Sequence, residues 1–219
     1  RIARHNGHPV LLQTYENKLV QTHPMVVGGD ELWRDYTVTV RLAPDGARGR
    51  SGLVFRYRND RCNYFFGVEG GKAVLKMIQH ESDFHKPFEK LLASQEFNWK
   101  PGEDLLAEVT VAGERITAKL NGQLTLAATD ATYPQGKIGL LADGPTRFAS
   151  VQVTASAAEK ARVAAARAKV AAQEGALQAA NPQAVLWKKF KTDGYGVARN
   201  LRFGDLDGCD AFHGMEIGQ

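Results

Sequence analysis

The sequence has few cysteines, no long apolar run and no block of charge of one sign. Its two cysteines, Cys62 and Cys209, lie far apart, so either a disulfide or two thiols is compatible with the chain and the redox compartment stays open. No stretch of about 18 apolar residues exists, and no signal peptide is visible. We therefore expect no membrane partner.

Basic residues do not form a continuous patch, although the formal net charge is +4. Lys and Arg are interspersed with acids, and the one cluster, Lys188-Lys189 with Lys191, is short. This pattern is typical of a solvated surface. We expect no nucleic-acid partner.

Strand-like segments dominate the chain between Ser51 and Ser150. The run from Ser51 to Ile78 contains three segments rich in β-branched and aromatic residues, which are separated at Asn59-Asp60 and at Gly70-Gly71. Further candidates are Pro9–Leu12, 107–128, 136–144 and 147–156. Short strands with regularly spaced turns favour a mostly β protein, an antiparallel β-sandwich of the jelly-roll type.

Local patterns define single elements of this sandwich. From Trp33 to Leu42, apolar and polar residues alternate, which predicts a strand with one buried and one wet face. Asn121-Gly122 predicts a type I′ hairpin, because both central residues of that turn need positive φ, and Gly113-Glu114 predicts a similar turn one strand earlier.

The composition changes after Ser156, which predicts three parts. Residues 1–156 form the jelly roll, and the Ala-rich segment 157–182 forms a helical linker that ends near Asn181-Pro182. Residues 183–219 read as a short β fragment that is too small to bury its own apolar face. We interpret the chain as a piece of a longer protein.

The motifs SGLVFRY, NYFF, RITAKLNGQL and GKIGL before RFASVQV resemble the concanavalin A-like jelly-roll modules of carbohydrate-active proteins. The resemblance covers about two thirds of the chain. Relatives of this kind include lectin-like modules, laminin-G-like domains and glycoside hydrolases. The resemblance implies a β-sandwich and a secreted or periplasmic location.

The segment ARNLRFGDLDG (Ala198 to Gly208) resembles the start of an FG-GAP β-propeller repeat, whose D-x-D-G-D-G-x-x-D motif binds calcium. Asp205 and Asp207 match the first two ligands, so the resemblance implies Ca²⁺ as a cofactor. Cys209 and His213 replace later ligands and are poor partners for a hard cation. A jelly roll, a helix and such a blade together resemble the N-terminal part of bacterial rhamnogalacturonan-lyase-like polysaccharide lyases, whose propeller would be a further partner.

Sugar binding requires hydrogen-bond donors beside an apolar platform. Strict alternation places Leu53, Phe55 and Tyr57 on one face and Val54, Arg56 and Arg58 on the other, so the two arginines are candidates for a wet binding face that recognises uronate carboxylates. The full set of carbohydrate-binding candidates is Arg56, Arg58, Tyr64, His80, His85 and Lys86.

Catalysis is the main alternative to binding. The E-x-D-x-x-E signature of laminarinase-type jelly rolls is absent. The cluster His80, Glu81, Asp83 and His85 is the local set that offers carboxylates or metal ligands. We expect a non-catalytic, carbohydrate-associated module of a polysaccharide-degrading protein, with a keto-disaccharide-hydrolase-like glycosidase and a laminin-G-like protein-interaction domain as alternatives.

Overall fold

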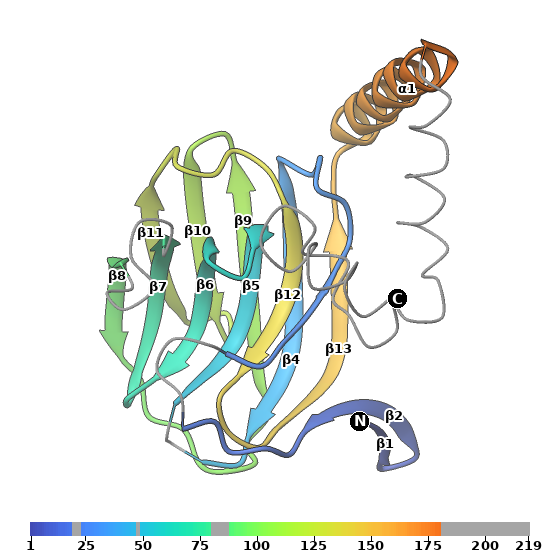
Figure 1. Cartoon of the computed structure of the whole chain (residues 1–219). Helices are drawn as coiled ribbons and strands as arrows, with labels where there is room; N and C mark the ends of the chain where they lie inside the picture. The colour runs from blue at the N-terminus through green and yellow to red at the C-terminus, as the bar shows by residue number, and fades with distance from the viewer. Residues whose placement is uncertain (19–22, 47–48, 80–87, 181–219) are drawn as a thin grey trace. The chain divides into compact units, whose positions relative to one another are not determined.

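The computed structural model describes residues 1–18, 23–46, 49–79 and 88–180. The chain divides into two compact units, Arg1–Val163 and Ala164–Gln219. The first unit contains two antiparallel sheets that are stacked face to face (Figure 1). This arrangement confirms the predicted jelly-roll β-sandwich followed by a helix. The predicted β fragment 183–219 lies outside the described residues.

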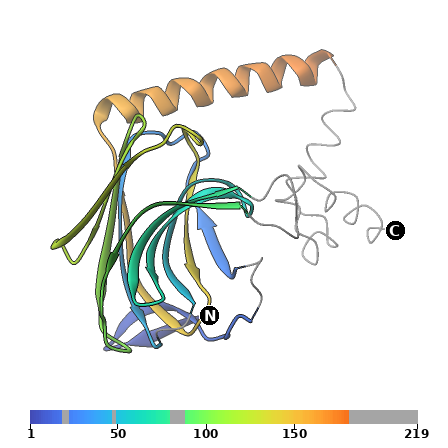
Figure 2. The same cartoon turned by 90° about the vertical axis from the view of Figure 1, so that its left-hand side faces the viewer.

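Each sheet combines strands that are distant in the sequence, and Figure 2 shows the two curved layers from the side. The seven-stranded sheet has, in spatial order, β1 (Ile2–His5), β2 (His8–Gln13), β13 (Thr146–Thr154), β4 (Tyr36–Pro44), β9 (Leu105–Ala112), β10 (Arg115–Leu120) and β11 (Leu124–Thr129). The six-stranded sheet has β3 (Met25–Gly28), β12 (Lys137–Ala142), β5 (Arg50–Asn59), β6 (Cys62–Glu69), β7 (Lys72–Gln79) and β8 (Phe88–Glu96).

The main core fills the space between the sheets. In β4 the predicted alternation is confirmed, because Tyr36, Val38, Val40 and Leu42 are buried while the residues between them are more exposed. Cys62 is buried in the same core, and Cys209 lies outside the described residues. Burial of these alternating apolar faces drives the two sheets together.

A second, smaller apolar cluster lies on the opposite face of the six-stranded sheet. Its buried members are Val54, Phe65, Val74, Ile78 and Leu141. We call this face, which points away from the seven-stranded sheet, the outer face. The central strands β5, β6 and β7 are therefore largely buried on both faces, so they read as nearly continuous apolar runs rather than as alternating patterns.

The predicted turn between β10 and β11 is confirmed. Asn121 and Gly122 have φ values of 52° and 71°, and the Gln123 amide donates to the Leu120 carbonyl at 3.2 Å. Positive φ at both central residues is the mark of a type I′ turn. Gly113, in the turn between β9 and β10, also has a positive φ, 58°.

The helix α1 (Ala157–Ala180) begins with a capped first turn. Ser156 Oγ accepts a hydrogen bond from the Glu159 amide at 3.1 Å, which satisfies one orphan donor of the helix start. The Glu159 carboxylate accepts from the Arg34 amide at 2.9 Å and from Arg162 at 2.7 Å. Arg162 also donates to the Leu32 carbonyl. These contacts attach the first turn to the segment between β3 and β4.

Within the described residues, no helix is long and apolar enough to cross a membrane.

Replacing Glu159 with glutamine is expected to destabilise the sandwich at neutral pH. Hydrogen bonds from Arg162 lower the pKa of Glu159 from 4.5 to about 2, which corresponds to up to about 3 kcal/mol of stability. Because the pKa is lower in the folded state, the ionised Glu159 carboxylate stabilises the fold at pH values above its unfolded-state pKa. This stabilisation is lost as the pH falls toward 2. Urea unfolding of Glu159→Gln should therefore show a large deficit at pH 7 and a small one at pH 2.5.

The matched control for this prediction is Glu96→Gln. Glu96 forms an ion pair with Lys72 at 3.0 Å, but its side chain is 75% exposed, and such surface pairs contribute about 0–1 kcal/mol. Equal deficits for the two variants at pH 7 would show that the Glu159 contacts do not stabilise the helix start.

Candidate functional site

The structure corrects the predicted placement of Arg56, which is buried and does not lie on a wet face. Arg56 is 1% exposed, and its guanidinium donates to the carbonyl oxygens of Arg34, Gly113 and Tyr133 at 3.2, 2.6 and 3.2 Å. Burial lowers its pKa. The guanidinium therefore connects three loops through hydrogen bonds to their carbonyl groups.

A bulge in β5 explains why strict alternation gave the wrong faces. Arg56 has a φ of 46°, and the register with β6 shifts between Phe55 and Asn59. The extra residue inverts the alternation locally. As a result Tyr57 packs against the outer-face cluster and not in the main core, which also corrects the predicted face of Tyr57.

Tyr64 is likewise buried, so the expectation of an accessible aromatic platform at this position is wrong. Tyr64 is 0% exposed and stacks on Phe55 with ring centroids 5.2 Å apart. Its hydroxyl donates to Asp130 Oδ1 at 2.6 Å. Burial raises the pKa of the Tyr64 hydroxyl. The side chain belongs to the hydrogen-bonded core.

Of the other candidates, Arg58 is exposed near the end of β5. Those that lie outside the described residues are His80, His85 and Lys86 of the predicted sugar site, Glu81 and Asp83 of the catalytic alternative, and Asp205 and Asp207 of the calcium motif. In the described ranges, no three His, Cys, Asp or Glu side chains are grouped so that they could hold a metal ion. The calcium site stays a prediction.

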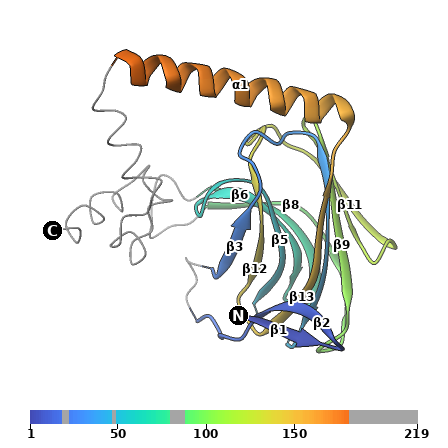
Figure 3. The same cartoon turned by 90° about the vertical axis from the view of Figure 1, so that its right-hand side faces the viewer.

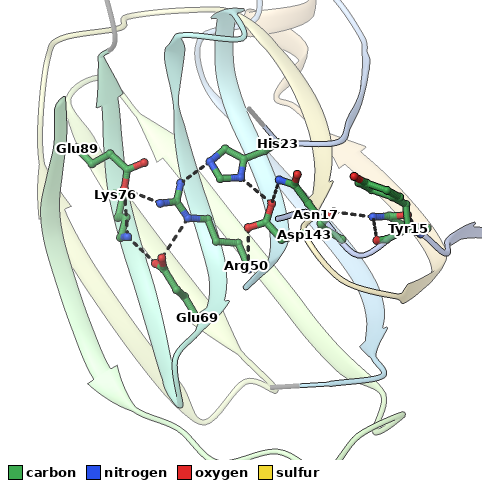
Figure 4. A network of polar contacts seen from close by, with 10 residues as sticks. Tyr15, Asn17, His23, Arg50, Glu69, Lys76, Glu89 and Asp143 are labelled. Atoms are coloured by element: carbon green, nitrogen blue, oxygen red, sulfur yellow. Dashed lines mark hydrogen bonds and ion pairs between the residues drawn. The ribbon is translucent and has the colours of Figure 1, made fainter. Parts of the chain in front are cut away.

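The richest polar cluster of the described chain lies on the outer face of the six-stranded sheet and runs across its strands (Figure 4). We call it the outer-face array. Its members are Asn17, His23, Arg50, Glu69, Lys76, Glu89 and Asp143. They come from β5, β6, β7 and β8, from the segments before β3, and from the residue that follows β12.

Arg50 is the centre of the array. Its Nε donates to Glu69 Oε1 at 3.1 Å and its Nη2 donates to Glu89 Oε2 at 2.6 Å. Its Nη1 lies 3.3 Å from His23 Nε2. The first residue of β5 thus connects the carboxylates of β6 and β8 through one rigid fork of donors.

Lys76 bridges the same two carboxylates. Its Nζ lies 2.5 Å from Glu69 Oε2 and 3.3 Å from Glu89 Oε2. Burial opposes ionisation of Glu89, but Arg50 and then Lys76 outweigh it and lower the pKa of that carboxyl. Glu89 therefore stays ionised, and two acids and two bases alternate around a closed ring of ion pairs.

His23 and Asp143 extend the array toward β12. His23 Nδ1 lies 2.7 Å from Asp143 Oδ1, and Asn17 Nδ2 donates to the same oxygen at 3.1 Å. The Arg50 amide donates to Asp143 Oδ2 at 3.1 Å. Burial raises the pKa of Asp143, but the hydrogen bonds from His23 and Asn17 outweigh it and lower the pKa overall.

The contacts of His23 suit one tautomer. Arg50 can only donate, so its contact with His23 is a hydrogen bond when Nε2 is the acceptor. In that tautomer the proton sits on Nδ1 and points at Asp143. The ring lies between a guanidinium and a carboxylate.

The aromatic ring of Phe65 packs beneath the array. The Arg50 guanidinium carbon lies 6.0 Å from the centroid of the Phe65 ring, and Phe65 is 0% exposed. Gly52 and Gly67 pair directly across β5 and β6. Any side chain at either glycine would strike the neighbouring strand and the Phe65 ring. The two glycines therefore allow the ring to lie against the sheet.

Exposure divides the array into layers. The side chains of His23, Arg50 and Asp143 are 9%, 9% and 11% exposed, whereas that of Glu69 is 28% exposed. Lys76 and Glu89 have intermediate values, 15% and 18%. Two carboxylates and an ammonium group are therefore the most accessible atoms, and Arg50 supports them from below.

A hollow of about 180 Å³ lies between β2 and β13 of one sheet and β3 and β12 of the other, four strands that are seen together in Figure 3. Leu11, Met25, Val26, Leu140 and Phe148 contribute to its lining. This lining is mostly apolar and offers few partners for hydroxyl groups. The outer-face array is therefore the better candidate for a polar ligand.

Sequence reasoning missed the array, because its seven members are scattered over six segments of the chain. One signal was present. Lys76 interrupts the otherwise apolar run AVLKMI, Arg50 begins one apolar strand, and Glu69 ends the next. Single charges on strands that are apolar on both faces need partners.

The fold and the array define this unit as a jelly-roll β-sandwich with an ion-paired outer face. No sequence profile of a known family and no curated protein sequence matches the chain. Solved structures do match its fold. The carbohydrate-binding module CBM66 from Bacillus subtilis has a TM-score of 0.53 and 16% identity over 71% of this chain and 91% of its own.

Two further matches show the range of proteins with similar structures. The GH43 protein BlXynB from Bacillus licheniformis has a TM-score of 0.46 and 15% identity, over 69% of this chain and 34% of its own length. The galectin LEC-6 from Caenorhabditis elegans has a TM-score of 0.41 and 13% identity, over 64% of this chain and 95% of its own. At such identities, the comparisons bear on fold alone.

Proposed function

We propose that residues 1–163 form a carbohydrate-binding module whose ligand site is the outer-face array. The observation that carries this proposal is the ring of Arg50, Glu69, Lys76 and Glu89. Charged donors and acceptors fixed side by side are suited to pairs of sugar hydroxyls, which both donate and accept. The similarity in fold to a carbohydrate-binding module supports the same function.

The setting of the module is also part of the proposal. We infer a non-catalytic role within a polysaccharide-degrading protein that is secreted or periplasmic, with a lyase domain as the partner. This inference is supported by the resemblance of the segments 51–156 and 198–208 to the front of such lyases. A binding module in this position would hold the polymer near a separate catalytic domain.

The proposed site predicts that Lys76→Gln weakens polysaccharide binding at least about tenfold. Removing the ammonium takes away a cation that contacts both Glu69 and Glu89, so the hydroxyl-binding geometry is lost. The measurement is a glycan array on the purified chain, followed by calorimetry on the best polymer. If Lys76→Gln does not fold, Glu69→Gln, which keeps the shape of the side chain, replaces it as the test variant.

The control variant is Lys119→Gln. This residue carries the same charge on β10 of the other sheet, where its contact with Glu108 is 3.7 Å long and exposed. Its binding should equal that of the unmodified chain. If the unmodified chain binds no sugar on the glycan array, the proposal is overturned and a laminin-G-like protein-interaction domain is favoured. If Lys76→Gln binds the polymer as tightly as the unmodified chain does, the sugar site lies outside the outer-face array.

Glycoside hydrolysis is the second candidate, and a specific observation favours it. Glu69 and Glu89 share one lysine, and the His23–Asp143 pair lies beside them. Glycosidases, however, need a carboxyl group that stays protonated to act as the general acid. The environment lowers the pKa of both Glu89 and Asp143, so binding ranks first. Release of reducing sugar from the bound polymer would reverse this order.

A further inference from the structure

The charges of the outer-face array bear on the kind of sugar it accepts. The array has two fixed cations, Arg50 and Lys76, and three carboxylates. Each cation contacts both Glu69 and Glu89. The positive charge is therefore already balanced within the ring, and an incoming anion would compete with two carboxylates that are fixed in place.

Asp143 adds a third carboxylate to the array. Its partners are the His23 ring, the side-chain amide of Asn17 and the backbone amide of Arg50. Hydrogen bonds from such donors stabilise the ionised form of a carboxyl group. The array thus has one more carboxylate than it has lysine and arginine side chains.

The most exposed atoms have the same bias. Glu69 and Glu89 flank Lys76 at the surface, while Arg50 is 9% exposed beneath them. Carboxylates only accept hydrogen bonds, so they attract hydroxyl donors and repel another carboxylate. The uronate preference expected from sequence relied on Arg56 and Arg58, and Arg56 is buried.

We propose that the outer-face array binds neutral, hydroxyl-bearing sugar units and rejects uronates. A pair of adjacent hydroxyls donates to Glu69 and Glu89 and accepts from Lys76, while the fixed carboxylates repel an acidic ring. This inference rests on the proposed carbohydrate-binding function and specifies its ligand class.

The test compares polymers that differ only at C6 of the ring. Glucan is paired with glucuronan, galactan with galacturonan, and mannan with mannuronan, in calorimetry on the unmodified chain at low ionic strength. We expect at least one neutral polymer to bind about tenfold more tightly than its uronate counterpart. Raising the ionic strength should narrow the difference, because salt screens repulsion between exposed charges.

Glu69→Gln provides an internal check, because it removes one repelling charge and keeps an acceptor oxygen. This variant should bind the neutral polymer more weakly than the unmodified chain does, and the ratio of its neutral to its uronate affinity should be smaller. A uronate polymer that binds the unmodified chain as well as its neutral counterpart would overturn the neutral-sugar inference and leave the carbohydrate-binding function standing. Absence of binding to all six polymers would overturn both.

Discussion

Arg56→Met is expected to destabilise the sandwich by about 3–5 kcal/mol, because a buried donor group is lost from three carbonyl oxygens at once. The carbonyls of Arg34, Gly113 and Tyr133 lie in three different loops, and water has little access to the site at 1% exposure of Arg56. Thermal unfolding should show a midpoint lower by about 10 °C.

Arg58→Met is the matched control for this prediction. Arg58 lies two residues further along β5 and is exposed, so the same substitution should change stability by less than about 0.5 kcal/mol. Arg56→Lys should also be destabilising, because an ammonium group cannot reproduce the planar fork of the guanidinium. Similar melting temperatures for Arg56→Met and Arg58→Met would contradict the bracing role assigned to Arg56.

Gly52→Ala is expected to destabilise the fold by about 3 kcal/mol, through strain between two neighbouring strands. A Cβ atom at Gly52 would lie 2.2 Å from the Phe66 carbonyl oxygen and 2.6 Å from Gly67 Cα. Both are backbone atoms, which cannot move aside without separating β5 from β6. The Phe65 ring, 3.0 Å away, would also have to shift.

The glycine prediction links stability to the proposed site. Displacing Phe65 removes the ring against which the Arg50 guanidinium packs. Gly52→Ala should therefore also weaken sugar binding by the molecules that still fold. Gly28→Ala is the control, since a Cβ there meets nothing within 4 Å. Chemical unfolding of the two variants side by side checks the prediction, and an unchanged midpoint for Gly52→Ala would show that the strands tolerate a side chain.

Local patterns predicted the fold because each element carries its own signal. The alternation in β4, the positive-φ pair Asn121-Gly122 and the alanine-rich run of α1 all depend on neighbouring residues alone. The fold class followed from the spacing of such elements. These predictions required no knowledge of which strands pair.

The site could not be predicted in the same way, because it depends on strand order and on one bulge. Arg50, Glu69, Lys76 and Glu89 come together only when β5, β6, β7 and β8 lie side by side. The bulge at Arg56 inverted the faces on which the sequence-based sugar site relied. A single extra residue in a strand leaves no clear mark in composition or periodicity.

The central claim is that a sugar binds at the outer-face array. The most direct test is a titration of the isotopically labelled chain with the best neutral oligosaccharide, followed by two-dimensional amide NMR. We predict saturable shift changes that centre on Arg50, Glu69, Lys76 and Glu89, with the apolar hollow beside Leu11 and Phe148 unaffected. Changes confined to that hollow or to the seven-stranded sheet would contradict the account.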